Sequence, residues 1–218
     1  QHSISRDQQE KMALESHQKA ASATEKNMFE DEIVSINGVT KDGCIRPETS
    51  LESMSGLKPA FDKDGVVTAA TSSPLTDGAA AVIVCSEDYA NKNSLEILAY
   101  IRGMAISGCS PEIMGIGPVL SSQKALKRAG IKLEDVDVIE MNEAFAAQSL
   151  ACVKELGVEM SKLNIHGGAI SMGHPLGASG ARITGKAASL LKETGKRYAL
   201  STMCVGGGQG CATVLERV

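Results

Sequence analysis

The chain has 218 residues, of which 43% are hydrophobic and 22% charged, with a formal net charge of −4. This length suits one large domain or two small ones, and the hydrophobic share supports a buried core. The acidic balance without a basic stripe argues against nucleic-acid binding, and no apolar run approaches the roughly 20 residues that span a membrane. Six scattered cysteines form neither a CxxC pair nor a zinc pattern with histidine. We therefore expect a reducing compartment, no disulfide framework and no metal site.

The first part of the chain predicts a helix, a strand and a long irregular segment. Residues 1–27 are rich in helix formers, with Ser5 as a candidate N-cap. Residues 32–39 are a strand candidate ended by an Asn-Gly pair. Residues 40–76 hold three of the six prolines and show little periodicity. Irregular segments of that length are usually functional, so a ligand-binding role is expected there.

The rest of the chain alternates between strand and helix patterns. Residues 78–86 form a continuous apolar run, which is typical of a strand buried on both faces. Further strands are predicted at 95–107, 136–141, 198–204 and 211–216, and helices at 87–93, 118–130, 144–156 and 179–193. From residue 95 onward this order predicts a layered α/β unit with a mixed sheet between helices.

The glycine-rich stretch 167–182 is the most unusual part of the sequence. It reads GGAISMGHPLGASGAR, and its five glycines in 16 residues disfavour a regular helix or strand because glycine loses much chain entropy in either. His174 lies in its middle, and an unperturbed imidazole pKa of about 6.5 suits proton transfer near neutrality. Taken alone, such a histidine is more simply a solvent-facing turn residue, but other features of the chain favour chemistry.

Cys204 and Asn142 are the other candidates for chemistry. Cys204 opens a second glycine loop, CVGGGQG, where a thiol would be presented rather than packed. Glycine N–H groups there, such as that of Gly206, can stabilise a developing oxyanion. Asn142 lies where a predicted strand gives way to a helix, and α/β sheets place ligand sites there. The simpler readings are a helix N-cap for Asn142 and a buried structural thiol for Cys204, as we assume for the other cysteines.

The stretches MNEAFA (141–146), GGAISMGHPLGASGAR and CVGGGQG, in this order, resemble the C-terminal signatures of the thiolase family. The similarity also runs through SHQKA, FDKDGVVTA and SPLTDGAAA. It implies a thiolase-like layered α/β fold, of which this chain carries the C-terminal half and part of the loop domain. Residues 1–76 would end the loop and CoA-binding region, 77–97 would return to a missing N-terminal domain, and 98–218 would form the C-terminal domain.

The resemblance also implies an activity. Thiolases are acetyl-CoA C-acyltransferases of fatty acid metabolism, including β-oxidation. They cleave 3-oxoacyl-CoA with CoA or run the reverse Claisen condensation, so coenzyme A is a substrate and no permanent cofactor is expected. By resemblance, His174 activates the nucleophilic cysteine and helps to line an oxyanion hole, Cys204 moves the α-proton, and Asn142 holds a water at that hole.

The family's CoA contacts match positions in the irregular segment. These positions are Arg46, Phe61, Ala69 and Ser73. An arginine beside a phosphate is chemically reasonable, and the phenylalanine could pack on the adenine or the pantetheine. Without the resemblance, the same residues read more simply as a surface charge, a core ring and turn residues.

The sequence departs from the family pattern in one large respect and in two smaller ones, at His166 and at Pro74, which replaces a commoner glycine beside Ser73. No cysteine lies in the family's N-terminal nucleophile motif. We therefore expect the acyl-accepting cysteine to lie outside this chain, the isolated chain to be inactive, and the sequence to be part of a longer enzyme. His166 stands where the family usually has Asn, and we expect it to pack rather than to act as a third base.

Two other readings compete with a thiolase. Ketoacyl synthases share the fold, but they use two histidines with one cysteine and lack a C-terminal cysteine–glycine loop, so Cys204 favours a thiolase. The second reading is a non-catalytic CoA- or lipid-binding module with a thiolase-like fold. Family resemblance further implies acyl-CoA and CoA as partners, a homodimer or homotetramer, and a cytoplasmic location, or an organelle matrix if a targeting segment is missing.

Overall fold

The computed structural model describes residues 2–218, whose contacts divide the chain into two compact units. The first unit contains the chain up to Asp77 with 143–151 and 164–174, and the second contains 78–142, 152–163 and 175–218. The elements in chain order are α1 Arg6–Glu25, α2 Leu51–Ser55, η1 Ala69–Thr71, α3 Glu87–Lys92, β1 Ala99–Gly108, η2 Pro111–Ile116, α4 Gly117–Ala129, η3 Leu133–Asp135, β2 Val138–Met141, α5 Ala146–Leu156, η4 Met160–Lys162, α6 Ala169–Met172, α7 Ser179–Thr194, β3 Tyr198–Val205 and β4 Gln209–Arg217. Among these residues no helix combines the length and apolar character needed to cross a bilayer.

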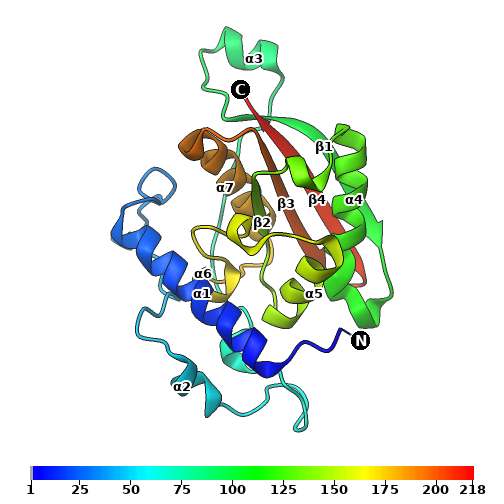
Figure 1. Cartoon of the computed structure of the whole chain (residues 1–218). Coiled ribbons are helices and arrows are strands. Elements are labelled where there is room, and N and C mark those ends of the chain that lie inside the picture. The colour runs from blue at the N-terminus through cyan, green and yellow to red at the C-terminus, as the bar shows by residue number, and fades with distance from the viewer. Residues whose placement is uncertain (1) are drawn as a thin grey trace. The chain divides into compact units, whose positions relative to one another are not determined.

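The second unit is built on a four-stranded sheet of order β1-β4-β3-β2 (Figure 1). β4 pairs antiparallel with β1 and with β3, whereas β2 runs parallel to β3. The connection between the parallel strands includes helices, as a parallel crossover requires. The predicted mixed sheet with helical layers is therefore confirmed.

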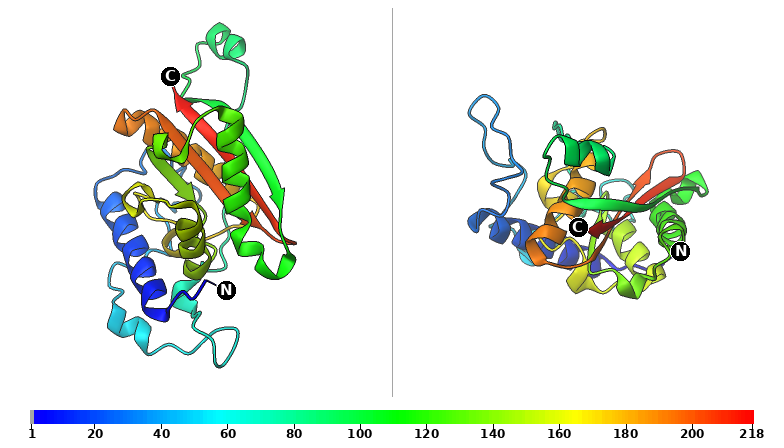
Figure 2. Two further views of the ribbon diagram at one scale, coloured as in Figure 1. Left: turned by 45° about the vertical axis from the view of Figure 1, so that its right-hand side comes forward. Right: turned by 90° about the horizontal axis from the view of Figure 1, so that it is seen from above.

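Helices α4 and α7 cover opposite faces of this sheet (Figure 2). The hydroxyl of Ser122 on α4 donates to Thr202 Oγ1 over 3.2 Å. On α7, the hydroxyl of Thr184 lies 3.0 Å from that of Ser201. Because neighbouring residues of a strand point to opposite faces, Ser201 and Thr202 place the two helices on opposite sides of β3. Side chains at 202 and 204 therefore share the α4 face.

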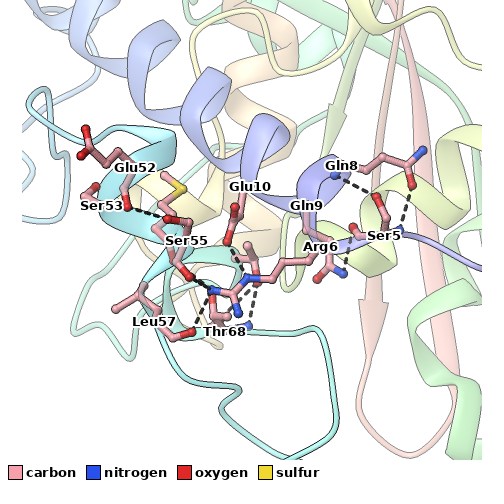
Figure 3. Close-up of polar contacts among 12 residues, drawn as sticks. Ser5, Arg6, Gln8, Gln9, Glu10, Glu52, Ser53, Ser55, Leu57 and Thr68 are labelled. Atoms are coloured by element: carbon pink, nitrogen blue, oxygen red, sulfur yellow. Dashed lines mark hydrogen bonds and ion pairs between the residues drawn. The ribbon is translucent and has the colours of Figure 1, made fainter.

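The first unit is organised by α1, which packs against α2, η1 and α6. Ser5 accepts a hydrogen bond from the Gln8 backbone while the Gln8 side chain accepts one from the Ser5 backbone, so the predicted N-cap is confirmed as a capping box. Arg6 then joins α1 to the end of α2 (Figure 3). Its Nη2 lies 2.8–3.0 Å from the carbonyl oxygens of Met54, Ser55 and Leu57. These contacts satisfy carbonyl groups that the end of a short helix leaves open.

Two predicted strands are wrong. Residues 78–86 belong to no helix or strand and pair with no strand among the described residues, and Ile83 and Val84 are 83% and 71% exposed. A continuous apolar run predicts burial, yet burial on both faces requires sheet neighbours that this segment does not have here. Residues 32–39 also form no strand: 33–35 are irregular and 36–39 form a tight turn. Asn37 and Gly38 both have positive φ, of 52° and 81°, and fold Ile36 back onto Val39 through an isolated bridge.

Candidate active site

His174 is held in the first unit by the glycine that precedes it. Gly173 has a φ of +97°, and a Cβ added there would lie 2.4 Å from Thr76 Oγ1. The backbone N–H of His174 donates to the same Thr76 oxygen over 3.3 Å. Only glycine combines this backbone conformation with so close an approach. The residues before the imidazole, which is half-buried, are therefore fixed by their fit to residue 76.

Cys204 is buried rather than presented, contrary to our expectation. It lies near the end of β3 opposite Gly210 of β4, and only 5% of it is exposed. Burial raises the pKa of its thiol from 9.0 to about 11, with smaller contributions in the same direction from Cys211 and Cys109. A desolvated thiol resists losing its proton because the thiolate is the charged form. In this state Cys204 holds a proton at neutral pH.

The turn after Cys204 combines a close backbone contact with open space. Gly206–Gly208 join β3 to β4, and a Cβ on Gly208 would lie 2.3 Å from the carbonyl oxygen of Cys109. The Gly208 oxygen also accepts a 2.7 Å hydrogen bond from the Cys109 N–H. Gly206 is exposed, and an added Cβ there would meet no atom within 4 Å. The turn is thus pinned at Gly208 and leaves room at Gly206.

Asn142 is fully buried at the carboxyl end of β2. Its N–H donates to Thr202 O over 3.0 Å, which extends the parallel ladder with β3 by one step. Helix α5 begins only at Ala146, so Asn142 is not its N-cap and the simpler reading of this residue is wrong. The second unit therefore brings Asn142 and Cys204 to the same ends of neighbouring parallel strands, whereas His174 belongs to the first unit.

Two shallow hollows on the first unit contain CoA candidates. One, of about 440 Å³, is lined by Arg46, Pro47, Glu48, Thr49 and Ser53. The other, of about 310 Å³, is lined by Phe61, Val67, Phe145, Ala147 and Gln148. Within the second hollow the rings of Phe61 and Phe145 meet edge to face, with centroids 5.7 Å apart. Phe61 is 74% exposed, so a flat apolar group could pack against its open face.

The other two CoA candidates line neither hollow. Ala69 is exposed at the start of η1. Ser73 donates from its N–H and its hydroxyl to Ala144 O, over 3.0 and 3.1 Å, which ties it to the residue before Phe145. Phe145 is a lining residue that the sequence alone did not single out, although it lies inside the MNEAFA stretch.

His166 lies against an aromatic ring in the first unit. Its imidazole meets the ring of Phe29 edge to face, with centroids 6.0 Å apart. Phe29 is itself buried at 7% exposure. This contact fits the packing role that we expected for His166.

Comparison with known protein families shows that this chain belongs to the thiolase family. The family description "Thiolase, N-terminal domain" matches residues 1–88, and "Thiolase, C-terminal domain" matches residues 95–217. Curated relatives are 3-ketoacyl-CoA thiolases. That of Vibrio parahaemolyticus is 52% identical over 99% of this chain and 59% of its own length, and that of Yersinia enterocolitica is 52% identical over 100% and 59%.

Solved structures agree with this assignment. Human mitochondrial 3-ketoacyl-CoA thiolase in complex with CoA superposes with a TM-score of 0.97 at 46% identity, over 100% of this chain and 56% of that one. The acetyl-CoA acetyltransferase of Bacillus anthracis superposes with a TM-score of 0.94 at 42% identity, over 99% and 57%. The chain spans about 59% of the length of the curated relatives that it matches.

Proposed function

We propose that this chain forms the C-terminal part of an acetyl-CoA C-acyltransferase that cleaves 3-oxoacyl-CoA with CoA, or runs the reverse condensation. The identity of 52% to 3-ketoacyl-CoA thiolases over nearly the whole chain is the observation that carries the proposal. It favours a degradative enzyme of β-oxidation. The nucleophilic cysteine that accepts the acyl group belongs to a part of the enzyme outside these 218 residues.

In this proposal His174, Cys204 and Asn142 are the catalytic residues that the chain supplies. Cleaving a 3-oxoacyl-CoA releases a thioester enolate, which needs a proton at carbon and fixed donors at oxygen. Cys204, whose pKa of about 11 keeps it protonated, supplies that proton. In condensation the thiol must act as a base, so nearby hydrogen-bond donors must lower its pKa. The Gly206 N–H, His174 and a water held by Asn142 serve the oxyanions.

CoA is the proposed substrate, and no permanent cofactor is needed. Its phosphates would meet the Arg46 hollow, because a guanidinium pairs well with phosphate oxygens. Its pantetheine arm would pass the Phe61–Phe145 hollow, with Ala69 and Ser73 beside the arm. The human mitochondrial relative crystallised with CoA supports this choice of ligand.

The same proposal covers the wider organisation. Residues 1–76 end the loop and CoA-binding region, 77–97 lead back to an N-terminal domain, and 98–218 form the C-terminal domain. The enzyme works as a homodimer or homotetramer in the cytoplasm, or in an organelle matrix if a targeting segment precedes the chain.

Calorimetric titration of CoA into the chain, with a thiolysis assay on the same sample, tests the proposal. We expect binding without turnover, and turnover after addition of the N-terminal portion of a close relative as a separate polypeptide. Failure to bind CoA would overturn the proposal. Binding with no turnover in the complemented sample would favour the non-catalytic CoA- or lipid-binding module.

A further inference from the structure

Glu143 makes a buried network in the first unit that the proposed catalytic roles do not use. Its carboxylate is 2% exposed and accepts three hydrogen bonds. Oε2 accepts from the Ser16 hydroxyl at 2.7 Å and from the Ile170 N–H at 3.2 Å, and Oε1 accepts from Asn164 Nδ2 at 2.7 Å. A buried carboxylate is costly unless such donors satisfy it, so the network is a fixed feature of this unit.

The glycine pair that opens the 167–182 stretch fits between α1 and this carboxylate. A Cβ on Gly168 would lie 2.2–2.4 Å from the Glu143 carboxyl atoms, and the Gly168 N–H donates to Ser16 Oγ over 3.1 Å. Gly167 has a φ of +85°, and its added Cβ would lie 2.7 Å from Ser16 O. Both glycines are therefore required by close contact with Ser16 and Glu143 rather than by flexibility.

Only a short, rigid path separates this anchor from the imidazole. Ile170, which donates to Glu143, is the second residue of α6, and α6 ends at Met172. Gly173 then fits against Thr76, and His174 follows. The segment is thus fixed at Gly168–Ile170 and again at Gly173–His174. The Glu143 carboxylate therefore helps to determine the position of the backbone from which the His174 imidazole extends.

We propose that Glu143 is a positioning residue: with Ser16 and Asn164 it holds the stretch 164–173 and thereby fixes the His174 imidazole. The anchoring itself is a property of the folded first unit. Its relevance to catalysis rests on the proposed function. Glu143 touches neither substrate nor reacting atoms in this account, so it acts through His174.

Hydrogen exchange and NMR on the whole chain test the anchoring without any need for turnover. In Glu143→Gln, an amide group cannot accept from Ser16, Ile170 and Asn164 at once, since one of its two positions now donates. We expect exchange at the Gly168 and Ile170 amides to speed up about tenfold, with displaced or broadened His174 imidazole signals.

A double variant that moves the carboxylate from position 143 to position 164 tests whether the lost protection from exchange can be restored. In Glu143→Gln with Asn164→Asp, the Gln oxygen can accept from Ser16 and Ile170 while its NH₂ donates to the new carboxylate. We expect this double variant to regain most of the protection. If Glu143 contributed only bulk stability, exchanging the two groups would restore no protection, because the amide and the carboxylate have similar volumes.

Two further variants keep the proposal falsifiable. Ser16→Ala removes a donor to Glu143 and also the acceptor of the Gly168 N–H, with little volume change. The informative amide is therefore that of Ile170, which bonds to Glu143 and not to Ser16, and it should loosen even if Glu143→Gln fails to fold. Thr24→Val is the matched control, because within residues 2–218 the Thr24 hydroxyl on the same helix bonds only to Ala20 O of α1, at 2.8 Å. Unchanged exchange and unchanged His174 signals in Ser16→Ala, or loosening as large in Thr24→Val, would overturn the proposal.

CoA affinity separates this proposal from the proposed function. We expect Ser16→Ala to bind CoA within about twofold of the parent chain, because Arg46 and Phe61 line separate hollows. A parent chain that binds no CoA would sink the proposed function and leave the anchoring of His174 intact. Normal CoA binding with no effect of Ser16→Ala on the 164–173 stretch would sink the positioning role alone.

Discussion

Gly117 and Gly210 touch backbone to backbone where α4 begins on β4. A Cβ built on Gly210 would lie 2.1 Å from both the carbonyl carbon and the oxygen of Gly117, and one built on Gly117 would lie 2.3 Å from Gln209 O. Gly210 is also the cross-strand partner of Cys204 and of Ser107, whose hydroxyl donates to Gly117 O at 3.2 Å. Since directly paired residues share a face, the start of α4 lies on the Cys204 side of the sheet.

The first prediction follows from this contact. Gly210→Ala should destabilise the chain by about 1–3 kcal/mol, because the methyl group must push α4 away from β4. Denaturant unfolding of the variant and the parent measures the difference. Gly206→Ala is the control, because an added Cβ there meets nothing within 4 Å, and its effect should stay within about 0.5 kcal/mol. Equal effects of the two substitutions would contradict the packing argument.

The second prediction concerns the Arg6 contacts of Figure 3. Arg6→Lys keeps the charge but loses the planar group that reaches the carbonyl oxygens of Met54, Ser55 and Leu57. We expect a loss of about 1 kcal/mol, with faster amide exchange concentrated in α2. Arg128→Lys is the comparison, since exposed Arg128 reaches a single carbonyl, that of Met104. Protection of α2 that is unchanged in Arg6→Lys would show that α2 does not depend on this contact.

The third prediction tests the aromatic hollow. Phe61→Leu removes the ring that meets Phe145 edge to face and should weaken CoA binding by about threefold to tenfold, the value of such a ring contact. Calorimetric titration gives the dissociation constants. Tyr89→Leu removes a ring that is also exposed, at 55%, but lies on α3, and it should bind CoA as the parent does. Weakening in both variants would indicate a general loss of structure.

Local sequence signals predicted the helices and the mixed sheet well. The start of α1 follows from Ser5 and Gln8, and α4 ends where Gly130 takes a left-handed φ of 71°. These features depend on neighbours within one turn, so a short window contains the needed information. The apolar run 78–86 predicts a buried strand, but such burial depends on sheet neighbours far away in sequence, and no described strand pairs with this run.

The candidate site was predicted less completely, for the same physical reason. The glycine loops could be seen in the sequence, but the partners that require glycine, such as Thr76 for Gly173 and Glu143 for Gly168, lie far away along the chain. The burial of Cys204 is likewise a tertiary effect, since the glycines after it suggested an open thiol. Such contacts depend on long-range packing, which the hydrophobic periodicity of the sequence does not reveal.

The last prediction follows from the buried thiol of Cys204. Its pKa rises from 9.0 to about 11 on burial, so the folded state favours the protonated form. The resulting stabilisation is present below pH 9.0 and is lost as the pH rises towards 11, because the unfolded chain ionises first. A pKa difference of this size between the folded and unfolded chain corresponds to at most about 2–3 kcal/mol of unfolding free energy.

Unfolding free energies measured from pH 8 to 11 for the Cys85→Ser chain, which lacks the exposed thiol, and for the same chain with Cys204→Ser check this prediction. As the pH rises, the unfolding free energy of the chain with Cys204 should fall relative to that of the Cys204→Ser chain. Only the first chain carries a buried group that titrates at position 204. A difference that stays constant over the range would mean that the thiol ionises as easily in the folded chain as in the unfolded one. That result would contradict the proposed role of Cys204 as a proton donor in cleavage.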